Sequence, residues 1–345
     1  MLYKRIIRPI LFSMDAEKAH HFTIKCLDVL GSSAIGRWLL KTLFTNDFSN
    51  QPIEICGLKF RNRVGLAAGL DKDAVAFRGL SALGFGFVEV GTVTPEPQPG
   101  NDRPRLFRLK KDEALINRMG FNNHGVKAMR AKLVNHTEGM IIGGNIGKNK
   151  STPNENAVND YLKCMKALHD VVDYFVVNIS SPNTPGLREL QDEDHLTDLL
   201  AQLVHDNNTY SQPKPIFVKI APDLSDEQLG TTVEVINKSG VHGVIATNTT
   251  IGRNDLLTSD DELKAIGNGG LSGKPLSKRS TEVITKIRSK ARKGLIIIAS
   301  GGVNSSKDAL NKLESGADLI QIYTGFVYEG PDLINEINKE LKLLN

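Results

Sequence analysis

An unusual concentration of hydroxyl and amide side chains lies at the end of the apolar run at residues 175–179. The stretch NISSPNTPG (178–186) supplies two serines, two asparagines and two prolines, more than a plain turn requires. Ser181 is the candidate in this stretch for a group that removes a proton from a substrate. Serine is a weak base unless its proton is relayed, and no histidine or carboxylate adjoins it in sequence. We expect Thr184 or a water molecule to act as that relay.

Polar and glycine residues also follow seven other short apolar runs. Each taken alone has an ordinary explanation, because lysine is common at surfaces and asparagine and glycine are common in turns. Their appearance after all eight runs instead predicts a functional rim of convergent polar groups. The other seven segments are AGLDK (68–72), TVTP (92–95), NIGK (145–148), Lys219, TNT (247–249), GG (301–302) and YTG (323–325).

Glycine-rich segments in the last third of the chain predict a site for phosphate. GLSG (270–273), Gly301-Gly302 and Thr324-Gly325 supply small residues, whose backbone N–H groups can approach an anion closely. Lys219 would then place a positive charge beside the ring of a phosphorylated, electron-accepting cofactor. The sequence contains no Walker A, GxGxxG or HExxH motif and no histidines at metal spacing, so it indicates neither triphosphate hydrolysis nor a metal site.

The apolar runs that precede these residues define the expected fold. Near-continuous apolar strands that alternate with helical stretches are typical of parallel sheets covered by helices. Eight such units within residues 51–345 predict a (β/α)8 TIM barrel of the α/β class, with its active site at the carboxyl ends of the strands. An open doubly wound sheet is the alternative, but it would be expected to carry a glycine fingerprint after its first strand. The runs are 64–67, 88–91, 141–146, 175–179, 216–220, 244–247, 295–300 and 319–324, preceded by a hairpin at 53–55 and 58–60.

Residues 1–46 are predicted to form a separate helical extension ahead of the barrel. Asp15 is placed to cap a first helix that ends at Gly31, and a second helix carries Trp38 and three other apolar residues, Ile35, Leu39 and Leu43. This segment holds seven Lys or Arg against three Asp or Glu, a net of +4 that equals the formal excess of the entire chain. Either a solvated helix face or contact with an anionic membrane would explain the charge. The balanced, weakly aromatic remainder argues against nucleic acid binding.

Several features of the chain bear on its cellular setting. No apolar run reaches the ~18–20 residues of a membrane span. Basic residues and Pro9 interrupt the first apolar stretch, which therefore lacks the core of a signal peptide. The three cysteines show no CxxC spacing, which favours a reducing compartment without a disulfide framework.

Long motifs spanning nearly the whole chain resemble the dihydroorotate dehydrogenase family, and within it the class 2, quinone-linked, membrane-associated type. Soluble class 1 members carry a cysteine at the position of Ser181, and none of the three cysteines here lies on that loop. The motifs are AAGLDK (67–72), GTVTPEPQPGNDRPRLFRL (91–109), INRMGFNN (116–123), NIGKNK (145–150), NISSPNTPGLR (178–188), VKIAPDLS (218–225), ATNTT (246–250), GGLSG (269–273) and QIYTGF (321–326).

The resemblance implies an FMN-containing barrel that oxidises dihydroorotate to orotate in pyrimidine biosynthesis and passes the electrons to a membrane quinone. It implies Ser181 as the base and residues 1–46 as a tunnel for the quinone, with the protein peripheral at the cytoplasmic face of the cell membrane. Amides and a lysine suit the N–H, C=O and carboxylate groups of orotate. The implied substrate residues are Lys72, Asn117, Arg118, Met119, Gly120, Phe121, Asn178, Asn183, Asn248 and Thr249. The implied FMN residues are Ala68, Gly69, Leu70, Asp71, Lys72, Thr92, Asn145, Asn178, Lys219, Thr247, Gly273, Gly302, Tyr323 and Thr324. The candidate quinone residues are His20, Arg108 and Tyr323.

Two departures from the family pattern fall near the expected phosphate site. Thr324 stands where serine is expected and ASGGV (299–303) where GVGGI is expected, and both keep the hydroxyl or the glycine pair. The rival functions are a class 1 type flavin barrel that uses fumarate or NAD, a Schiff-base aldolase that uses Lys219, and a non-catalytic barrel that binds a phosphorylated ligand. The basic N-terminal helices and the missing loop cysteine argue against the first. The joint presence of base, lysine and amides argues against the third.

Overall fold

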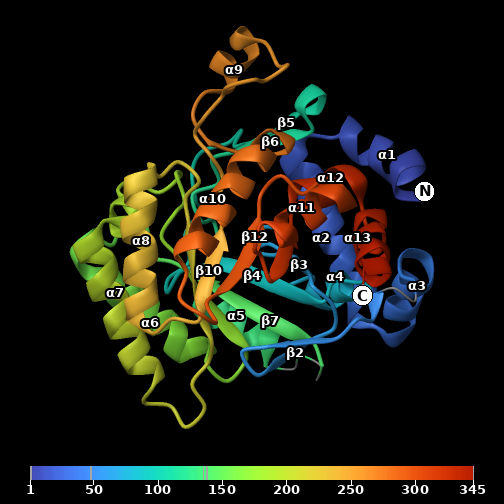
Figure 1. Ribbon diagram of the computed structural model, residues 1–345. Helices are drawn as coiled ribbons and strands as arrows, with labels where there is room; N and C mark the ends of the chain where they lie inside the picture. The colour runs from blue at the N-terminus through green and yellow to red at the C-terminus, as the bar shows by residue number, and fades with distance from the viewer. Residues whose placement is uncertain (1, 47–48, 135, 137–138, 345) are drawn as a thin grey trace.

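The computed structural model describes residues 2–46, 49–134, 136 and 139–344, and its centre is a closed barrel of parallel strands (Figure 1). The barrel strands are β3 (Val64–Leu66), β4 (Phe87–Val93), β7 (Ile141–Ile146), β8 (Tyr174–Asn178), β9 (Ile216–Ile220), β10 (Gly243–Ala246), β12 (Ile296–Ser300) and β13 (Leu319–Ile322). They follow one another around the barrel in chain order, and β13 pairs with β3 to close it. The predicted (β/α)8 barrel is therefore confirmed, and the open doubly wound sheet is wrong.

Helices cover the outside of the barrel, as strands that are apolar on both faces require. In β4, Val88 and Val90 point outward under this layer, while Phe87 and Glu89 point into the barrel. One covering helix, α8 (Asp226–Ser239), starts with a capping box, in which Ser225 Oγ accepts the Gln228 N–H at 3.1 Å and the Gln228 side chain accepts the Ser225 N–H at 3.0 Å. The covering helices are α4 (Phe77–Ala82), α5 (Val126–Leu133), α6 (Ala157–Leu168), α7 (Glu193–Asn207), α8 (Asp226–Ser239), α10 (Ser277–Lys290), α11 (Ser306–Glu314), α12 (Thr324–Glu329) and α13 (Asp332–Leu344).

The interior of the barrel is closed by aromatic side chains at the amino ends of the strands. Phe87, Tyr174 and Phe217 are buried there and pack edge to face, with ring centroids 6.5 and 5.4 Å apart. The predicted hairpin, β1 (Ile53–Ile55) and β2 (Leu58–Phe60), seals this end. Because this layer is apolar and full, a binding cavity can only open at the opposite, carboxyl end.

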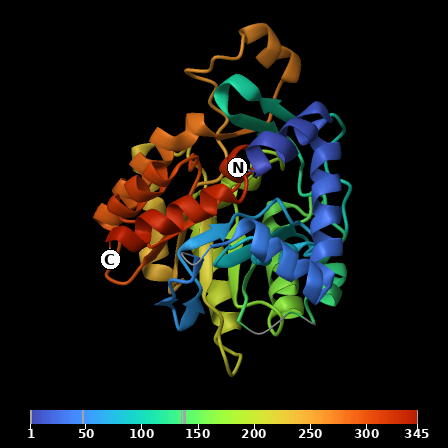
Figure 2. The ribbon, with the colours of Figure 1, turned by 90° about the vertical axis from the view of Figure 1, so that its right-hand side faces the viewer.

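A small antiparallel sheet stands beyond the carboxyl ends of the strands and was not expected from the sequence. It consists of β5 (Leu106–Leu109), β6 (Ala114–Asn117) and β11 (Gly270–Gly273), in the order β11-β6-β5. Figures 1 and 2 show β5 and β6 at the same end of the molecule as the short helix α9 (Asp260–Ile266). This sheet brings residues about 150 positions apart in sequence into register, with Asn117 opposite Gly270.

The predicted N-terminal helices are present beside the barrel (Figure 2, blue). A π-helical turn (Tyr3–Ile7) and α1 (Arg8–Ser13) precede α2 (Ala16–Ser32) and α3 (Ala34–Phe44). Asp15 caps α2 as expected, since its side chain accepts the Glu17 and Lys18 N–H groups at 3.0 Å.

The predicted end of α2 at Gly31 is wrong, because the helix continues to Ser32. Gly31 serves close packing instead: a Cβ atom at this position would lie 2.5 Å from the backbone nitrogen of Gly79 in α4. A Cβ at Gly79 would in turn lie 2.3 Å from the Leu27 carbonyl oxygen. The glycine pair therefore lets two helix backbones approach more closely than any side chain would allow.

A buried ion pair joins α2 to the loop that precedes β5. Arg105 donates to Glu17 Oε1 through Nη2 at 2.9 Å, and its Nη1 donates to the carbonyl oxygens of Pro99 and Asn101. Arg105 and Glu17 are both buried, and the neighbouring arginines hold the pKa of Glu17 below its usual value despite that burial. Losing one partner of a buried pair typically costs about 3–5 kcal/mol, because the other charge is left uncompensated. This pair therefore ties the N-terminal extension to the barrel.

Candidate active site

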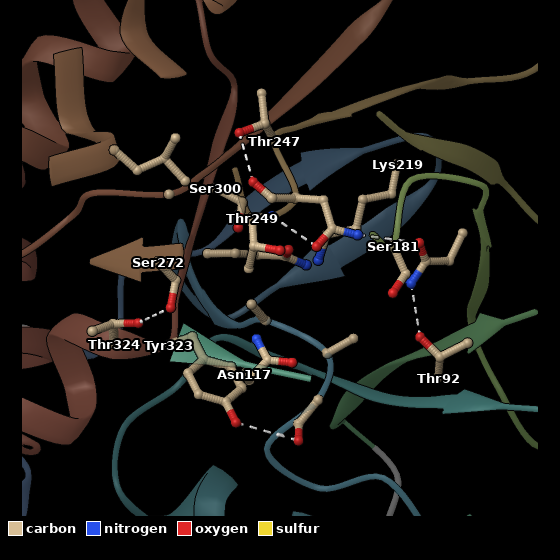
Figure 3. Close-up of a pocket in the computed structure, with 18 of the residues that line it drawn as sticks. Thr92, Asn117, Ser181, Lys219, Thr247, Thr249, Ser272, Ser300, Tyr323 and Thr324 are labelled. Carbon is tan, nitrogen blue, oxygen red and sulfur yellow. Dashed lines mark hydrogen bonds between the residues drawn. The ribbon is translucent and has the colours of Figure 1, made fainter. Parts of the chain in front are cut away.

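Side chains alternate between the two faces of each strand, and one set of polar residues therefore points into the open end of the barrel. In β9, Phe217 lies in the closed aromatic layer, so Lys219 lies one layer above it; Val176 and Asn178 have the same relation in β8. Figure 3 shows Lys219, Thr92 and Ser181 facing the cavity that results. Its lining contains Ala67, Ala68, Gly69, Lys72, Thr92, Asn117, Met119, Gly120, Phe121, Asn178, Ser181, Asn183, Lys219, Thr247, Asn248, Thr249, Ser272, Leu276, Ser300, Gly301, Gly302, Val303, Gln321, Ile322, Tyr323, Thr324 and Gly325.

A buried charge pair forms the floor of this cavity. The Lys219 ammonium lies 4.0 Å from Glu89 Oε1, and both side chains are almost fully buried. Glu89 accepts hydrogen bonds from Asn145 Nδ2 at 2.7 Å and from the Gln321 amide. Burial lowers the pKa of Lys219, while the Glu89 carboxylate acts in the opposite direction. A cation is thus presented to the cavity with its counter-ion beneath it.

A chain of amides and hydroxyls runs from this floor along one wall. Thr92 Oγ1 donates to Asn145 Oδ1 at 2.5 Å and accepts from Asn178 Nδ2 at 2.8 Å. Asn248 Nδ2 donates to Ser180 Oγ at 3.0 Å and to Asn178 Oδ1 at 3.3 Å. These bonds orient each amide, so the donors and acceptors that face the cavity are held in place before a ligand arrives.

The Ser181 side chain lies in the cavity wall on the loop after β8. It is 6 % exposed, and its Oγ accepts the Asn183 backbone N–H at 3.3 Å. Asn183 in turn donates from Nδ2 to Asn117 Oδ1 at 3.1 Å, which joins this loop to the small sheet above the barrel. An N–H donor to the hydroxyl oxygen stabilises negative charge there, which favours proton loss. Thr184, the candidate relay, is buried on the same loop.

Lys72 brings a second ammonium to the cavity, from the loop after β3. Its Nζ donates to Asn122 Oδ1 at 2.8 Å. Burial, and secondarily the charge of Arg105, lower the pKa of Lys72 to about 7. Next to it, Gly120 and Phe121 adopt left-handed backbone with φ of 69° and 52°, and a Cβ at Gly120 would lie 2.7 Å from Asn101 Nδ2. Met119, Gly120 and Phe121 all line the cavity.

The far end of the cavity is built from small residues and hydroxyls. Ser272 and Thr324 share a hydrogen bond of 2.8 Å between their hydroxyl oxygens, as Figure 3 shows. Gly302 has a φ of 69°, and a Cβ there would lie 2.2 Å from Ser277 Cα, so only glycine fits. Gly301 and Gly302 both line the cavity, and glycine lets backbone N–H groups approach a phosphate closely.

Several predicted site residues lie outside the lining. Asp71 is buried beneath the first loop, where its carboxylate accepts the Val75 and Ala76 N–H groups at 2.8 Å; burial raises its pKa to about 6. Arg118 turns away, donates to the Ile266 and Asn268 carbonyl oxygens and stacks over the Phe107 ring. The others outside the lining are Leu70, Asn145 and Gly273, together with His20 and Arg108.

Other residues of the site were not among the predicted ones. Ser300 and Gln321 line the cavity, and Glu89 supports Lys219 from below. Glu89 and Gln321 are polar residues within otherwise apolar strands, and they share the inward parity of Phe87 and Leu319 in the aromatic layer. That parity was a signal available in the sequence. Within the ranges that the structure describes, no group of three or more His, Cys, Asp or Glu could hold a metal ion.

A second, apolar cavity of about 330 Å³ lies between the N-terminal helices and the barrel, a volume in the range of small-molecule sites. All three candidate quinone residues, His20, Arg108 and Tyr323, line it. Burial, and secondarily the charge of Lys72, lower the pKa of His20 to about 3, so its ring is neutral near pH 7. Tyr323 lines both cavities and donates from its hydroxyl to the Gly69 carbonyl oxygen at 3.5 Å. The two cavities are therefore neighbours that share one aromatic wall.

Proteins of known identity match the chain over almost its full length. A family model described as dihydroorotate dehydrogenase matches residues 52–344. A protein of Christiangramia forsetii named dihydroorotate dehydrogenase (quinone) is 54% identical over 340 residues, covering 99% of this chain and 98% of the relative. One of Chromobacterium violaceum with the same name is 48% identical, covering 97% and 96%. The crystal structure of the Eimeria tenella enzyme in complex with ferulenol superposes with a TM-score of 0.83 at 36% identity, covering 95% of this chain and 91% of that one.

These matches confirm the resemblance on which the expectations for the site rested. They favour the quinone-linked type over the class 1 type, the aldolase and the non-catalytic barrel, because the relatives that cover the whole chain carry the quinone-linked name. The chain belongs to the dihydroorotate dehydrogenase family, in its quinone-linked class.

Proposed function

We propose that this protein oxidises (S)-dihydroorotate to orotate, with FMN as the hydride acceptor and a membrane quinone as the final electron acceptor, in the synthesis of UMP. The observation that carries the proposal is that one cavity, at the carboxyl ends of the strands, is lined by Ser181, Lys219 and four asparagine side chains. The asparagines are Asn117, Asn178, Asn183 and Asn248. That arrangement offers a proton acceptor, a set of matched donors and acceptors, and a cation, which are the groups this oxidation requires.

The substrate end of the cavity is assigned to the Ser181 loop and the residues opposite it. Ser181 Oγ takes the proton next to the substrate carbonyl, and Thr184 or water relays it away. Asn117, Asn178, Asn183 and Asn248 bind the edge of the pyrimidine ring, because an amide offers both a donor and an acceptor. Lys72 and the backbone of residues 119–121 hold the carboxylate. Thr249 completes this wall, and Arg118 supports it from behind through its bonds to the segment before β11.

FMN is assigned to the remaining length of the cavity. When bound, it accepts a hydride from dihydroorotate and hands the electrons on to the quinone. Lys219 would place a positive charge against the ring, and Gly302 and Thr324 would cradle its phosphate. Gly273 would support this cradle from behind, because it packs against the Thr324 side chain. Ala68, Gly69, Thr92, Thr247 and Tyr323 would surround the ring. Leu70, Asp71 and Asn145 would hold these residues in position. The buried cation and the Gly301–Gly302 turn, which lines the same cavity, both suit an anionic flavin.

The apolar cavity is assigned to the quinone. It adjoins the flavin cavity at Tyr323, so a quinone ring there would lie beside the edge of the flavin. The neutral His20 and the half-buried Arg108 supply the polar groups that the quinone oxygens need. Arg108 is held by Leu11 and Met14, whose carbonyl oxygens accept from its guanidinium.

Residues 1–46 are assigned to peripheral contact with the anionic cytoplasmic face of the cell membrane. Nine of the thirteen large apolar side chains that are exposed on the described residues lie between Leu2 and Leu43, including Ile35 at 79 % and Trp38 at 65 % exposure. None of the helices in the described ranges is both long enough and apolar enough to cross a bilayer. Amphipathic helices rich in basic residues bind at the bilayer interface through apolar burial, with about 1 kcal/mol from each basic residue near anionic lipid.

The visible spectrum of the purified protein tests the proposed function. We expect the absorption of an oxidised flavin, its loss when dihydroorotate is added without air, and its return when a quinone is then added. Colourless protein, or a flavin that dihydroorotate does not bleach, would contradict the proposal. Trapping of an aldehyde substrate on Lys219 by borohydride would support the aldolase instead.

Replacing Lys219 with methionine is expected to lower the flavin reduction potential or the retention of flavin, because a cation near the ring stabilises its reduced, anionic form. A charge contribution of about 1–3 kcal/mol corresponds to some tens of millivolts for a two-electron couple, for which 30 mV is about 1.4 kcal/mol. A potentiometric titration measures the shift. Lys148 is an equally buried lysine that donates to the Thr152 carbonyl oxygen outside the cavity, so Lys148→Met is the matched control. Equal potentials and flavin contents in both variants would make Lys219 a structural residue only.

A further inference from the structure

The guanidinium of Arg188 connects the three loops that follow β8, β9 and β10. Arg188 lies in a 3-10 turn, η5 (Leu187–Gln191), at the end of the Ser181 loop. Its Nε donates to the Ser180 carbonyl oxygen at 3.1 Å and its Nη2 to the Thr249 carbonyl oxygen at 3.1 Å. Its Nη1 donates to Asp223 Oδ2 at 2.9 Å. One planar group thus holds an acceptor from each loop.

Asp223 extends the same connection to the segment after Thr249. Its Oδ1 accepts from the Thr250 hydroxyl, and its Oδ2 accepts the Ile251 N–H at 3.2 Å. The Arg188 and Asp223 side chains are 24 % and 22 % exposed, so the pair is largely sheltered from water. A partly buried pair with this many fixed partners resists rotation more than an exposed ion pair does.

The bond from Arg188 Nε to the Ser180 carbonyl oxygen affects the orientation of Ser181. The Ser180 carbonyl belongs to the peptide unit that joins Ser180 to Ser181, so holding its oxygen fixes the plane from which the Ser181 side chain projects. The bond to Thr249 acts on the other side, because Thr249 follows Asn248, whose amide donates to Ser180 Oγ at 3.0 Å. Arg188 therefore sets the loop that carries the base against the loop that carries a ring-binding amide.

We propose that Arg188 is a positioning residue for the oxidation of dihydroorotate: through Ser180, Thr249 and Asp223 it holds Ser181 Oγ at the distance and angle from which it removes the substrate proton. Arg188 does not line the cavity, and it acts through the Ser181 loop. This inference rests on the proposed function. Misplacing a reacting group by about 1 Å can cost about 10²-fold in rate, so loss of the guanidinium should be visible in the step that Ser181 performs.

The test compares the two half-reactions of the holoenzyme by stopped flow. In Arg188→Ala we expect flavin reduction by dihydroorotate to slow by about 10–10²-fold, while reoxidation by quinone keeps the parental rate. Guanidinium added to the solution should restore part of the lost rate, and methylammonium should not, because only the planar fork matches the three acceptors. Arg188→Lys, which keeps the charge but not the fork, should remain slow. If the alanine variant does not fold, Arg188→Lys tests the proposal in its place.

Arg279 provides the matched control. It is also partly buried and donates to two backbone oxygens of the loop after β9, those of Pro222 and Leu224, at 2.9 and 2.8 Å, but the Ser181 loop is not among its partners. Arg279→Ala should therefore leave flavin reduction unchanged. Three results would each overturn the proposal. They are parental rates of flavin reduction in both Arg188 variants, equal slowing of both half-reactions, and failure of guanidinium to restore any of the lost rate. Failure of the proposed function is a different result, because dihydroorotate would then not bleach the parent protein at all.

Discussion

Replacing Ser181 with alanine is expected to slow the reduction of the bound flavin by dihydroorotate by about 10²–10⁴-fold, the range typical of lost acid–base catalysis. The cavity wall around it should survive, because the only hydrogen bond to Ser181 Oγ that the structure gives comes from the Asn183 N–H, which is part of a loop held by other bonds. The variant should therefore still bind FMN and orotate. Stopped-flow absorbance of the flavin without air measures the effect.

The pH dependence provides the control for this assignment. In the parent protein the rate should rise with pH, because the proton acceptor has to be free of its own proton. Ser181→Cys should retain part of the rate and gain activity as the pH approaches the ordinary thiol pKa of about 8.5. A Ser181→Ala variant whose flavin bleaches at a near-parental rate would remove Ser181 from the role of base.

Filling the apolar cavity is expected to abolish turnover with long-chain quinone and leave the dihydroorotate half-reaction intact. Thr23 lies on α2 and lines this cavity, so Thr23→Trp would occupy part of its roughly 330 Å³. Thr23 does not line the flavin cavity, and the charge pair of that cavity lies within the barrel, so bleaching by dihydroorotate should keep the parental rate. Steady-state turnover with quinone and a single bleaching experiment separate the two effects.

This substitution is a sharper test than removing residues 1–46. A chain starting near Asn50 would lose Glu17 and leave the buried Arg105 unpaired beside the loop that holds Asn101, so the substrate half-reaction could fail for a structural reason. Lys25 is exposed on the same helix, and Lys25→Trp is the matched control. Parental quinone turnover in Thr23→Trp, with the cavity filled, would exclude the tunnel.

The barrel could be predicted because its units are local. Each strand is a short apolar run, each is followed by a helical stretch, and parallel strands place their carboxyl ends at one edge whatever the details of packing. The polar residues after the runs therefore had to meet, and the structure brings Lys72, Asn178, Ser181, Lys219 and Asn248 to one cavity. The family motifs are local in the same sense, since a contiguous stretch such as NISSPNTPGLR can be recognised from the sequence without knowledge of the fold.

Pairings between distant segments could not be predicted in this way. The sheet of β5, β6 and β11 aligns residues about 150 positions apart, and nothing in either segment specifies the other. Gly31 carried the signature of a helix end, but the backbone of Gly79 lies against it, and that close crossing of two helices is the reason for a glycine there. When a residue is required by a segment that is distant in sequence but close in space, the neighbouring residues along the chain do not reveal the reason.

By itself, then, the sequence determined the architecture, the edge of the barrel where chemistry occurs and the residue types gathered there, because these depend on periodicity and on local motifs. Only the tertiary structure decided which charges neutralise one another: Glu89 with Lys219 under the cavity, and Glu17 with Arg105 between helix and barrel. It also decided that Arg188 ties three loops together. Electrostatic energy depends on the distances between charged atoms and on their burial. Both are set only when the strands and helices have packed.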